Sequence, residues 1–187
     1  MLLTESRLRS LSSSEKVLKK ATASAILHES VTSTRDSYDI FLSHSKMDSE
    51  LILGVKSLLE KYGFSVYVDW VDDPLLIRSN VNATSAAVIR GRMRSSTMLI
   101  YAHTLNSSSS RWCPWELGFF DGIKSGNVFI MPVSTDEKYG FDGQEYLGLY
   151  PYVDEAQSQL GEMSLWINTK KESPNLKTAL SRVYAPM

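Results

Sequence analysis

The tract that decides the fold is Thr97-Met-Leu-Ile-Tyr-Ala102, which is apolar at nearly every position. A run of this kind is typical of a central parallel strand, whose side chains are buried on both faces of the sheet. Working outward from it, four further tracts have the composition of strands, with β-branched and aromatic residues prominent. They are Tyr38-Asp-Ile-Phe-Leu-Ser43, Phe64-Ser-Val-Tyr-Val-Asp69, Asn127-Val-Phe-Ile-Met-Pro-Val133 and Leu165-Trp-Ile-Asn168.

Helical patterns alternate with these strands. Residues 49–62 place apolar side chains on one face and are followed by Gly63, a typical helix terminator. Residues 83–93, 114–123 and 176–183 are the other predicted helices. Alternation of strand and helix implies right-handed crossovers and a covered parallel sheet. The predicted fold is therefore α/β: a flavodoxin-like open, mainly parallel five-stranded sheet with helices on both faces.

The first 36 residues differ in composition from the remainder, being rich in Ser and Thr and slightly basic. Within them, residues 14–29 have a thin apolar stripe at helical spacing. We expect a helical lead-in that packs on the domain or on another copy, rather than a membrane-surface helix, because its apolar face lacks Trp and Phe. The predicted organisation is an N-terminal extension, residues 1–36, and a single domain, residues 37–187.

Composition narrows the classes of partner and compartment. The formal net charge of −1 gives no whole-chain attraction to nucleic acid or to an anionic membrane. No apolar run reaches the roughly 18 residues of a membrane span, and the N-terminus lacks the apolar core of a signal peptide. The single cysteine, Cys113, excludes an internal disulfide and fits a reducing compartment. We therefore expect a cytoplasmic protein without nucleic-acid or membrane partners.

The sequence lacks the signature motifs of several common nucleotide-binding, metal-binding and nucleophilic sites. Neither a G-x-G-x-x-G dinucleotide fingerprint nor a P-loop occurs. The histidines, His28, His44 and His103, form no short-spaced cluster with Cys113, so no metal site is expected. Cys113 has no histidine close to it along the chain that could act as its base. We therefore expect Cys113 to be a small apolar residue at the start of a helix rather than a nucleophile.

The most informative stretch surrounds Glu116. In open α/β sheets, ligands bind beyond the carboxyl ends of the strands, which here nominates residues 43–48, 70–82, 103–112 and 134 onward. Pro114 is best tolerated in the first turn of a helix, which places Glu116 at about the third helical position at this edge. Glutamate at that position often only caps its own helix, and spacing alone leaves capping and function equally open. Trp112, four residues earlier, could share its face and offer an aromatic plane to a cationic ring.

Two tracts together resemble Toll/interleukin-1 receptor (TIR) domains of the bacterial, NAD-cleaving type found in Thoeris antiphage defence. Tyr38-Asp-Ile-Phe-Leu-Ser-His-Ser45 resembles their opening strand, and Ser109-Ser-Arg-Trp-Cys-Pro-Trp-Glu-Leu117 resembles their W-C-x-x-E-L box. The resemblance implies that Glu116 is the catalytic residue and that NAD is the substrate, with no cofactor and no metal. It further implies a nucleotide pocket lined by Ser43, His44, Ser45, Asp69, Trp70 and Trp112.

The connection from residue 70 to residue 82 is about twice the usual length of roughly 2–6 residues. It carries the apolar tract Pro74, Leu75, Leu76 and Ile77 amid charges, which suggests a contact surface. The corresponding loop of TIR domains docks against a neighbouring copy, so the resemblance implies a homo-oligomer. The alternative is that Leu75 to Ile77 fold back on the sheet.

Three functions remain open at this point. The first is an NAD glycohydrolase or ADP-ribosyl cyclase, acting in antiphage or immune signalling with an effector protein that responds to its nucleotide product. Cleavage of this N-ribosyl bond passes through an oxocarbenium-like state that an ionised carboxylate stabilises. The second is a non-catalytic TIR adaptor or scaffold, in which Glu116 is only a cap. The third is a nucleoside deoxyribosyltransferase-like enzyme, which would use a similar sheet and a glutamate nucleophile on other nucleosides.

Overall fold

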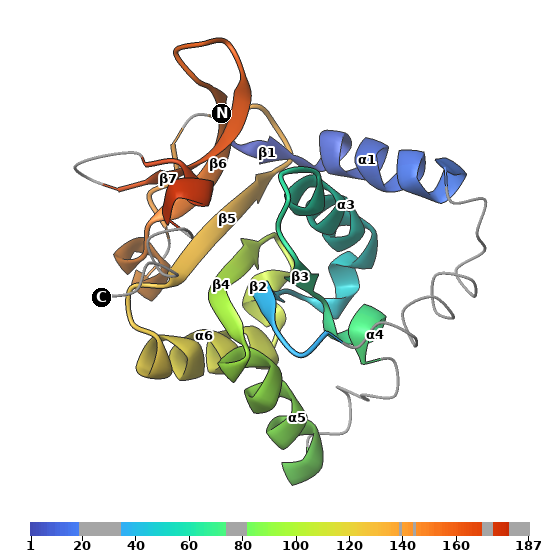
Figure 1. Ribbon diagram of the computed structural model, residues 1–187, viewed down its shortest axis with the longest axis vertical. Coiled ribbons are helices and arrows are strands. Elements are labelled where there is room, and N and C mark those ends of the chain that lie inside the picture. Colours follow the sequence, from blue (N-terminus) through green and yellow to red (C-terminus); the bar gives the residue numbers. More distant parts are fainter. Residues whose placement is uncertain (19–34, 74–81, 139, 144, 170–173, 180–187) are drawn as a thin grey trace.

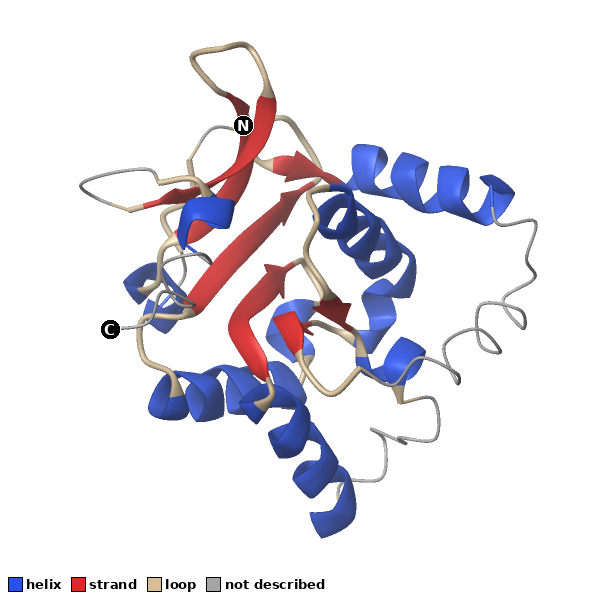
Figure 2. Ribbon diagram, viewed as in Figure 1, coloured by secondary structure: helices blue, strands red, loops and turns tan. Residues whose placement is uncertain are grey.

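The computed structural model describes residues 1–18, 35–73, 82–138, 140–143, 145–169 and 174–179. It is an α/β fold in which helices cover both faces of a twisted, mainly parallel sheet (Figures 1 and 2). The strand order is β3-β2-β4-β5-β6-β7, and β1 pairs separately with β5. This arrangement confirms the predicted flavodoxin-like class.

The strands are β1 (Leu3–Thr4), β2 (Tyr38–Ser43), β3 (Val66–Tyr67), β4 (Ser96–His103), β5 (Val128–Ser134), β6 (Tyr152–Gln157) and β7 (Met163–Asn168). The helices are α1 (Glu5–Leu18), α3 (Ser49–Lys61), α4 (Asp69–Asp72), α5 (Ala83–Arg94) and α6 (Trp112–Ile123), and the 3-10 helices are η1 (Lys46–Asp48), η2 (Ser107–Ser109) and η3 (Glu145–Leu149). Residues 176–179 are also helical, while the rest of the helix predicted over 176–183 lies outside the described residues.

Two apolar clusters sandwich the sheet, and β4 contributes to both. Met98, Ile100 and Ala102 join the cluster that contains the buried face of α3. Leu99 and Tyr101 point the other way, into the cluster that contains the buried faces of α5 and α6. This alternation is the consequence of a strand that is buried on both sides, as its apolar run predicts.

Within the described residues, the sheet has seven strands rather than the predicted five. The two additional strands are β1, which is only two residues long, and β6, which carries two acidic residues in its middle. Both carboxylates of β6 are buried and paired: Asp154 accepts a 2.8 Å hydrogen bond from Asn168, and Glu155 accepts a 2.6 Å hydrogen bond from Tyr62. These long-range partners make acidic residues tolerable in a strand that their charge alone argues against.

The N-terminal segment is built into the domain. Strand β1 pairs in parallel with β5 through Leu3 and Val133, and α1 packs against α3 (Figure 1). Leu8 of α1 is fully buried, and its backbone lies so close to Gly54 that a Cβ there would meet the Leu8 carbonyl oxygen at 2.1 Å. Packing on the domain was one of the two arrangements predicted, although the helix begins at Glu5 rather than at residue 14. Residues 19–29 of the predicted helix lie outside the described residues.

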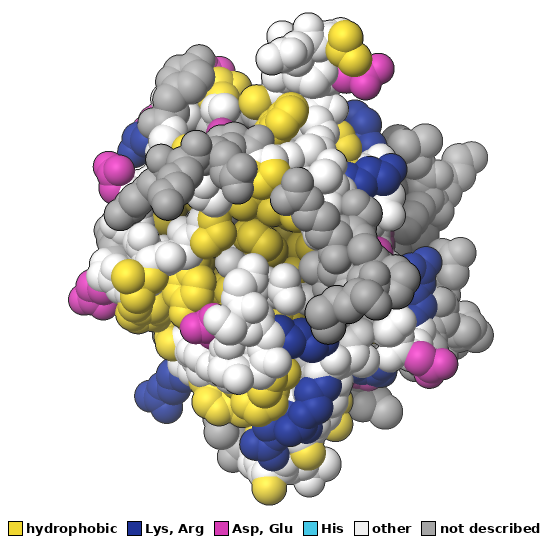
Figure 3. Space-filling view, turned by 60° about the vertical axis from the view of Figure 1, so that its left-hand side comes forward, with side chains coloured by type: hydrophobic (Ala, Val, Ile, Leu, Met, Phe, Trp, Pro, Cys, Tyr) yellow, Lys and Arg dark blue, Asp and Glu magenta, His cyan; other side chains and the backbone are white. Residues whose placement is uncertain are grey.

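One side of the molecule is notably apolar. When the left of Figure 1 is turned toward the viewer, hydrophobic side chains gather around a hollow at the centre of the face (Figure 3).

Within the described part of the chain, no helix is both long enough and apolar enough to cross a membrane.

Candidate active site at the carboxyl edge of the sheet

The candidate site lies where the direction of the sheet reverses. The chain goes from β2 outward to β3, and then returns to β4 on the other side of β2 before continuing to β5. Strands β2 and β4 therefore end side by side at a topological switch point, with Ser43 in register with Tyr101. Ligands of open α/β sheets bind in the crevice outside such a point.

The central contact at this switch point joins Ser43 and Glu116. The Ser43 hydroxyl, at the end of β2, donates a 2.7 Å hydrogen bond to Oε2 of Glu116 on α6. Both side chains are fully buried. A hydroxyl bonded to a carboxylate is a charge-assisted pair, roughly twice as strong as a neutral one, so it fixes the direction of the acid. The structure thus brings together the two predicted site residues that lie 73 positions apart.

The position of Glu116 within α6 differs from the expectation. The helix begins at Trp112, so Pro114 is its third residue and Glu116 its fifth. The first four N–H groups of a helix are those that need a cap, so Glu116 lies beyond the capping turn. Oε2 of its carboxylate instead accepts a hydrogen bond from Ser43 of β2, a contact outside its own helix.

The next residue, His44, connects the same loop to α4. Its Nδ1 lies 2.8 Å from the carbonyl oxygen of Leu42, and its Nε2 accepts a 3.0 Å hydrogen bond from the indole N–H of Trp70. Asp69 Oδ1 lies 3.3 Å from the same Nε2. His44 and Asp69 are buried, whereas Trp70 is partly exposed. The structure therefore brings these three predicted site residues into one cluster.

A third connection, which the sequence did not reveal, runs from η1 to the loop after β4. Asp48 is buried and accepts hydrogen bonds from the Thr104 hydroxyl at 2.5 Å and from the Asn106 amide at 2.6 Å. Ser45, also buried, accepts a 3.4 Å bond from the backbone N–H of Met47 and so caps η1. Asp48, Thr104 and Asn106 all lie in segments nominated by the strand-end rule, but only their pairing in space identifies them.

The loop after β2 consequently connects three neighbouring segments of the candidate site. Ser43 contacts α6, His44 contacts α4, and Asp48 contacts the loop after β4. Each connection uses a buried polar side chain with a defined partner, which is the arrangement that gives a site a single geometry.

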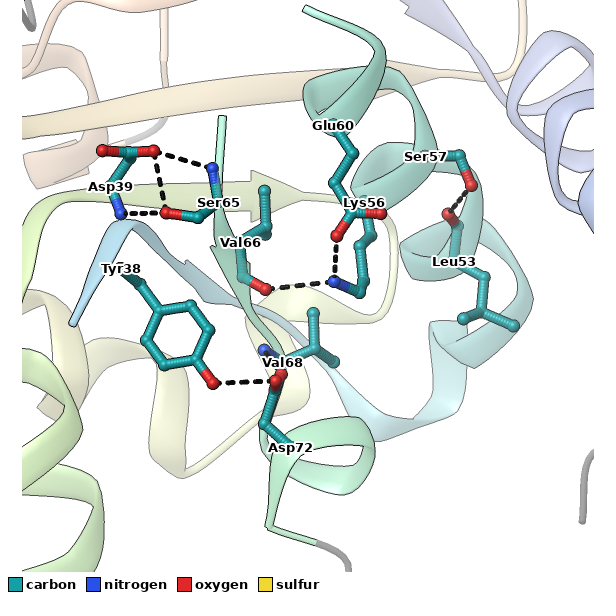
Figure 4. Close-up of polar contacts among 10 residues, drawn as sticks. All are labelled: Tyr38, Asp39, Leu53, Lys56, Ser57, Glu60, Ser65, Val66, Val68 and Asp72. Carbon is teal, nitrogen blue, oxygen red and sulfur yellow. Dashed lines mark hydrogen bonds and ion pairs between the residues drawn. The ribbon is translucent and has the colours of Figure 1, made fainter. Parts of the chain in front are cut away.

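Helix α4 is held in place by a carboxylate at its end. Asp72 accepts a 2.7 Å bond from the backbone N–H of Val68 and a 2.9 Å bond from the Tyr38 hydroxyl (Figure 4). Lys56 of α3 donates a 3.1 Å bond to the carbonyl of Val66, in the strand that leads to α4. Burial and the neighbouring Asp72 raise the pKa of Tyr38, so its hydroxyl stays protonated and continues to donate. These bonds fix the position of α4 and therefore of the Asp69 and Trp70 side chains that it carries.

The following residue, Asp73, is clamped to α5. Arg92 binds it through two parallel hydrogen bonds of 2.9 Å, and the Tyr67 hydroxyl donates a third of 2.8 Å. Burial acts to raise the pKa of Asp73, but the bonds from Arg92 and Tyr67 lower it overall. The predicted association residues begin directly after this clamp: Pro74, Leu75, Leu76 and Ile77 lie outside the described residues.

The two tryptophans of the W-C-x-x-E-L box and the following Phe119 form a row of contacting aromatic rings along α6. The rings of Trp112 and Trp115 meet edge to face with centroids 5.3 Å apart, and Trp115 stacks on Phe119 at 5.9 Å. All three are partly buried against the apolar cluster on this side of the sheet. Cys113 is fully buried in that cluster, as expected for a small apolar residue at the start of a helix.

The histidine at the end of β4 belongs to a separate set of contacts. His103 Nδ1 lies 3.3 Å from the Ser107 hydroxyl, and its ring lies 5.3 Å from that of Phe141. Burial lowers its pKa, so the neutral ring is favoured. Among the described residues, no group of three or more His, Cys, Asp or Glu side chains is arranged to hold a metal ion.

The fold and these contacts define a flavodoxin-like α/β protein that holds one buried carboxylate at the switch point of its sheet. No protein-family model matches the chain. The chain is 55% identical over 119 residues to the "Probable 3' cyclic ADP-D-ribose synthase ThsB'" of Bacillus cereus (strain MSX-D12), a match that covers 62% of this chain and 60% of that protein. It is 34% identical over 83 residues to the "Putative cyclic ADP-D-ribose synthase TIR2" of Cytobacillus dafuensis, which covers 44% of this chain and 22% of that protein.

These relatives confirm the resemblance to bacterial TIR domains of the Thoeris kind. The matches span about 60% and 22% of the relatives' lengths. The activity of the whole relatives is therefore only proposed for this chain.

Proposed function

We propose that this chain cleaves the nicotinamide–ribose bond of NAD, with Glu116 as the catalytic carboxylate and a cyclic ADP-ribose as the nucleotide product. The observation that carries the proposal is the fixed carboxylate of Glu116, which the Ser43 hydroxyl orients at the switch point. Support comes from the two relatives, both of which are named as cyclic ADP-D-ribose synthases.

The proposed chemistry needs an anion and no general acid. Nicotinamide is attached to the ribose as a pyridinium, so the electron pair of the breaking C–N bond neutralises the leaving ring. The ribose carbon becomes an oxocarbenium-like cation. A preorganised carboxylate stabilises that charge because it is already in place when the charge develops. Attack by water on this carbon, with loss of a proton, gives ADP-ribose, whereas attack by a group of the same nucleotide gives a cyclic product.

NAD can bind at Glu116 only if the side chains around this residue rearrange. Glu116 has no exposed surface, so a ribose can contact it only when covering side chains move aside. We propose that the remaining predicted residues surround the pocket once it opens, either in contact with NAD or in support of residues that contact it; they are Ser43, His44, Ser45, Asp69, Trp70 and Trp112. Association of copies through Pro74–Ile77, an effector protein that binds the product, and a cytoplasmic location belong to the same proposal.

The test is a product analysis. Purified protein, at high concentration and with a crowding agent that favours assembly, is incubated with NAD, and nicotinamide and nucleotides are quantified by mass spectrometry. We expect nicotinamide together with a nucleotide one water lighter than ADP-ribose. Intact NAD under every assembled condition would contradict the proposal and favour a non-catalytic adaptor. Turnover of deoxynucleosides with NAD untouched would favour a deoxyribosyltransferase.

A further inference from the structure

The ring of His44 has a defined protonation pattern because of its two neighbours. A backbone carbonyl can only accept a hydrogen bond, so the 2.8 Å contact with Leu42 requires a proton on Nδ1. An indole N–H can only donate, so the 3.0 Å contact with Trp70 requires a lone pair on Nε2. Together the two contacts select the neutral ring with its proton on Nδ1.

The same contacts leave His44 poorly suited to touch a substrate. Its ring is 1% exposed, and both nitrogens are engaged with protein groups. The Asp69 carboxylate lies 3.3 Å from the same Nε2, farther than the indole nitrogen of Trp70 at 3.0 Å. Trp70 is the partly exposed member of the cluster.

The indole of Trp70 is fixed at two places. Its backbone belongs to α4, which the bond from Tyr38 to Asp72 anchors to β2, and the single polar atom of its side chain is bound to His44. Part of the ring packs against the apolar cluster around α3, and the remainder is exposed. An indole held in this way presents a rigid aromatic surface to a planar ring, at low entropic cost.

We propose that His44 is a positioning residue, which holds the indole of Trp70 as an aromatic wall for a heteroaromatic ring of the substrate. The proposal rests on the proposed function for the identity of that substrate, a dinucleotide with two such rings. His44 then acts on substrate binding through Trp70, and takes no part in bond cleavage. Stacking of a base on an aromatic side chain is sequence-tolerant and strong enough that loss of the wall raises KM about tenfold.

The contact can be tested without any enzyme assay. The chain has four tryptophans, so a proton–nitrogen correlation spectrum contains four indole signals, and Trp70→Phe identifies the one from Trp70. We expect that signal to be shifted downfield and to exchange slowly. Long-range correlations of the His44 ring should show the proton on Nδ1. A wild-type His44 ring protonated on Nε2 alone would overturn the proposal.

Variants then separate positioning from a merely structural role. His44→Ala should move the Trp70 signal and raise KM about tenfold with kcat within about threefold, and His44→Gln, which keeps an acceptor, should recover part of both effects. His103→Ala, a histidine outside this cluster, should leave the Trp70 signal in place. A Trp70 signal unaffected by His44→Ala, or a loss confined to kcat, contradicts the proposal. If the signal moves but no protein variant cleaves NAD, the contact stands and the proposed function fails.

Discussion

Replacement of Gly54 by alanine tests how the N-terminal segment is attached to the domain. Gly54 lies in α3 where α1 crosses it, and a Cβ at this position would lie 2.1 Å from the carbonyl oxygen of Leu8 and 2.7 Å from its carbonyl carbon. Real Cβ atoms do not approach backbone within 3.0 Å, so α1 has to shift by about 1 Å. The obstacle is backbone, which cannot rotate away as a flexible side chain can.

The expected magnitude follows from two opposing effects. Overpacking of a well-packed contact costs about 1–3 kcal/mol, and a backbone obstacle favours the upper part of that range. Alanine in place of glycine inside a helix returns about 1 kcal/mol. The net loss in the free energy of unfolding is therefore about 1–2 kcal/mol, which for a chain of this size lowers Tm by about 4 °C.

Gly91→Ala is the matched control for this experiment. Gly91 lies within α5, and a Cβ there would meet nothing within 4 Å, so the same substitution should stabilise by about 0.5–1 kcal/mol. Both variants are measured by thermal and denaturant unfolding. If Gly54→Ala stabilises the protein as Gly91→Ala does, α1 does not pack on α3 as described.

Three further predictions concern the site and its supports. Ser43→Ala should reduce kcat for NAD cleavage about tenfold or more, because Glu116 loses its orienting donor; an unchanged kcat in steady-state kinetics would argue against that role. Arg92→Met should lower the free energy of unfolding at pH 7 by about 1 kcal/mol, and this difference should begin to shrink once the pH falls below about 4, the ordinary pKa of an aspartate, and keep shrinking as the pH passes through the lower pKa that Asp73 has in the folded protein; a difference that does not shrink with acidification would contradict the ion pair. Since burial lowers the pKa of His103, its contribution to stability is present above pH 6.5 and is lost as the pH falls, so denaturation of His103→Phe at pH 7.5 and 5.5 should show a weaker pH dependence than the wild type.

The fold was largely predictable because its central strands are apolar at consecutive positions. The tract from Thr97 to Ala102 leaves little choice but a strand buried on both faces, and the structure places it between β2 and β5. Strand β6 was not predictable in the same way. Its Asp154 and Glu155 argue against a buried strand unless the partners are known, and those partners, Asn168 and Tyr62, are supplied by other parts of the chain.

The site was predictable at the level of segments and not of contacts. The strand-end rule and Pro114 place Glu116 at the edge where the structure has it, but a proline in the first turn does not mark the first residue of the helix, which starts two residues earlier. Local spacing could not show that the acid faces Ser43, because that contact depends on how β2 and α6 pack. Asp48 illustrates the same limit. Its role in connecting the loop after β2 to the loop after β4 becomes visible only when the structure places Thr104 beside it.

The central claim is that the negative charge of Glu116 stabilises the ribosyl cation. The most direct measurement is the rate of nicotinamide release from saturating NAD by Glu116→Gln, which keeps the size of the side chain and the ability to accept from Ser43 while removing the charge. We predict a loss of about a thousandfold in kcat, equivalent to about 4 kcal/mol of transition-state stabilisation, in a protein that remains folded. Release of nicotinamide by this variant at the wild-type rate would contradict the claim.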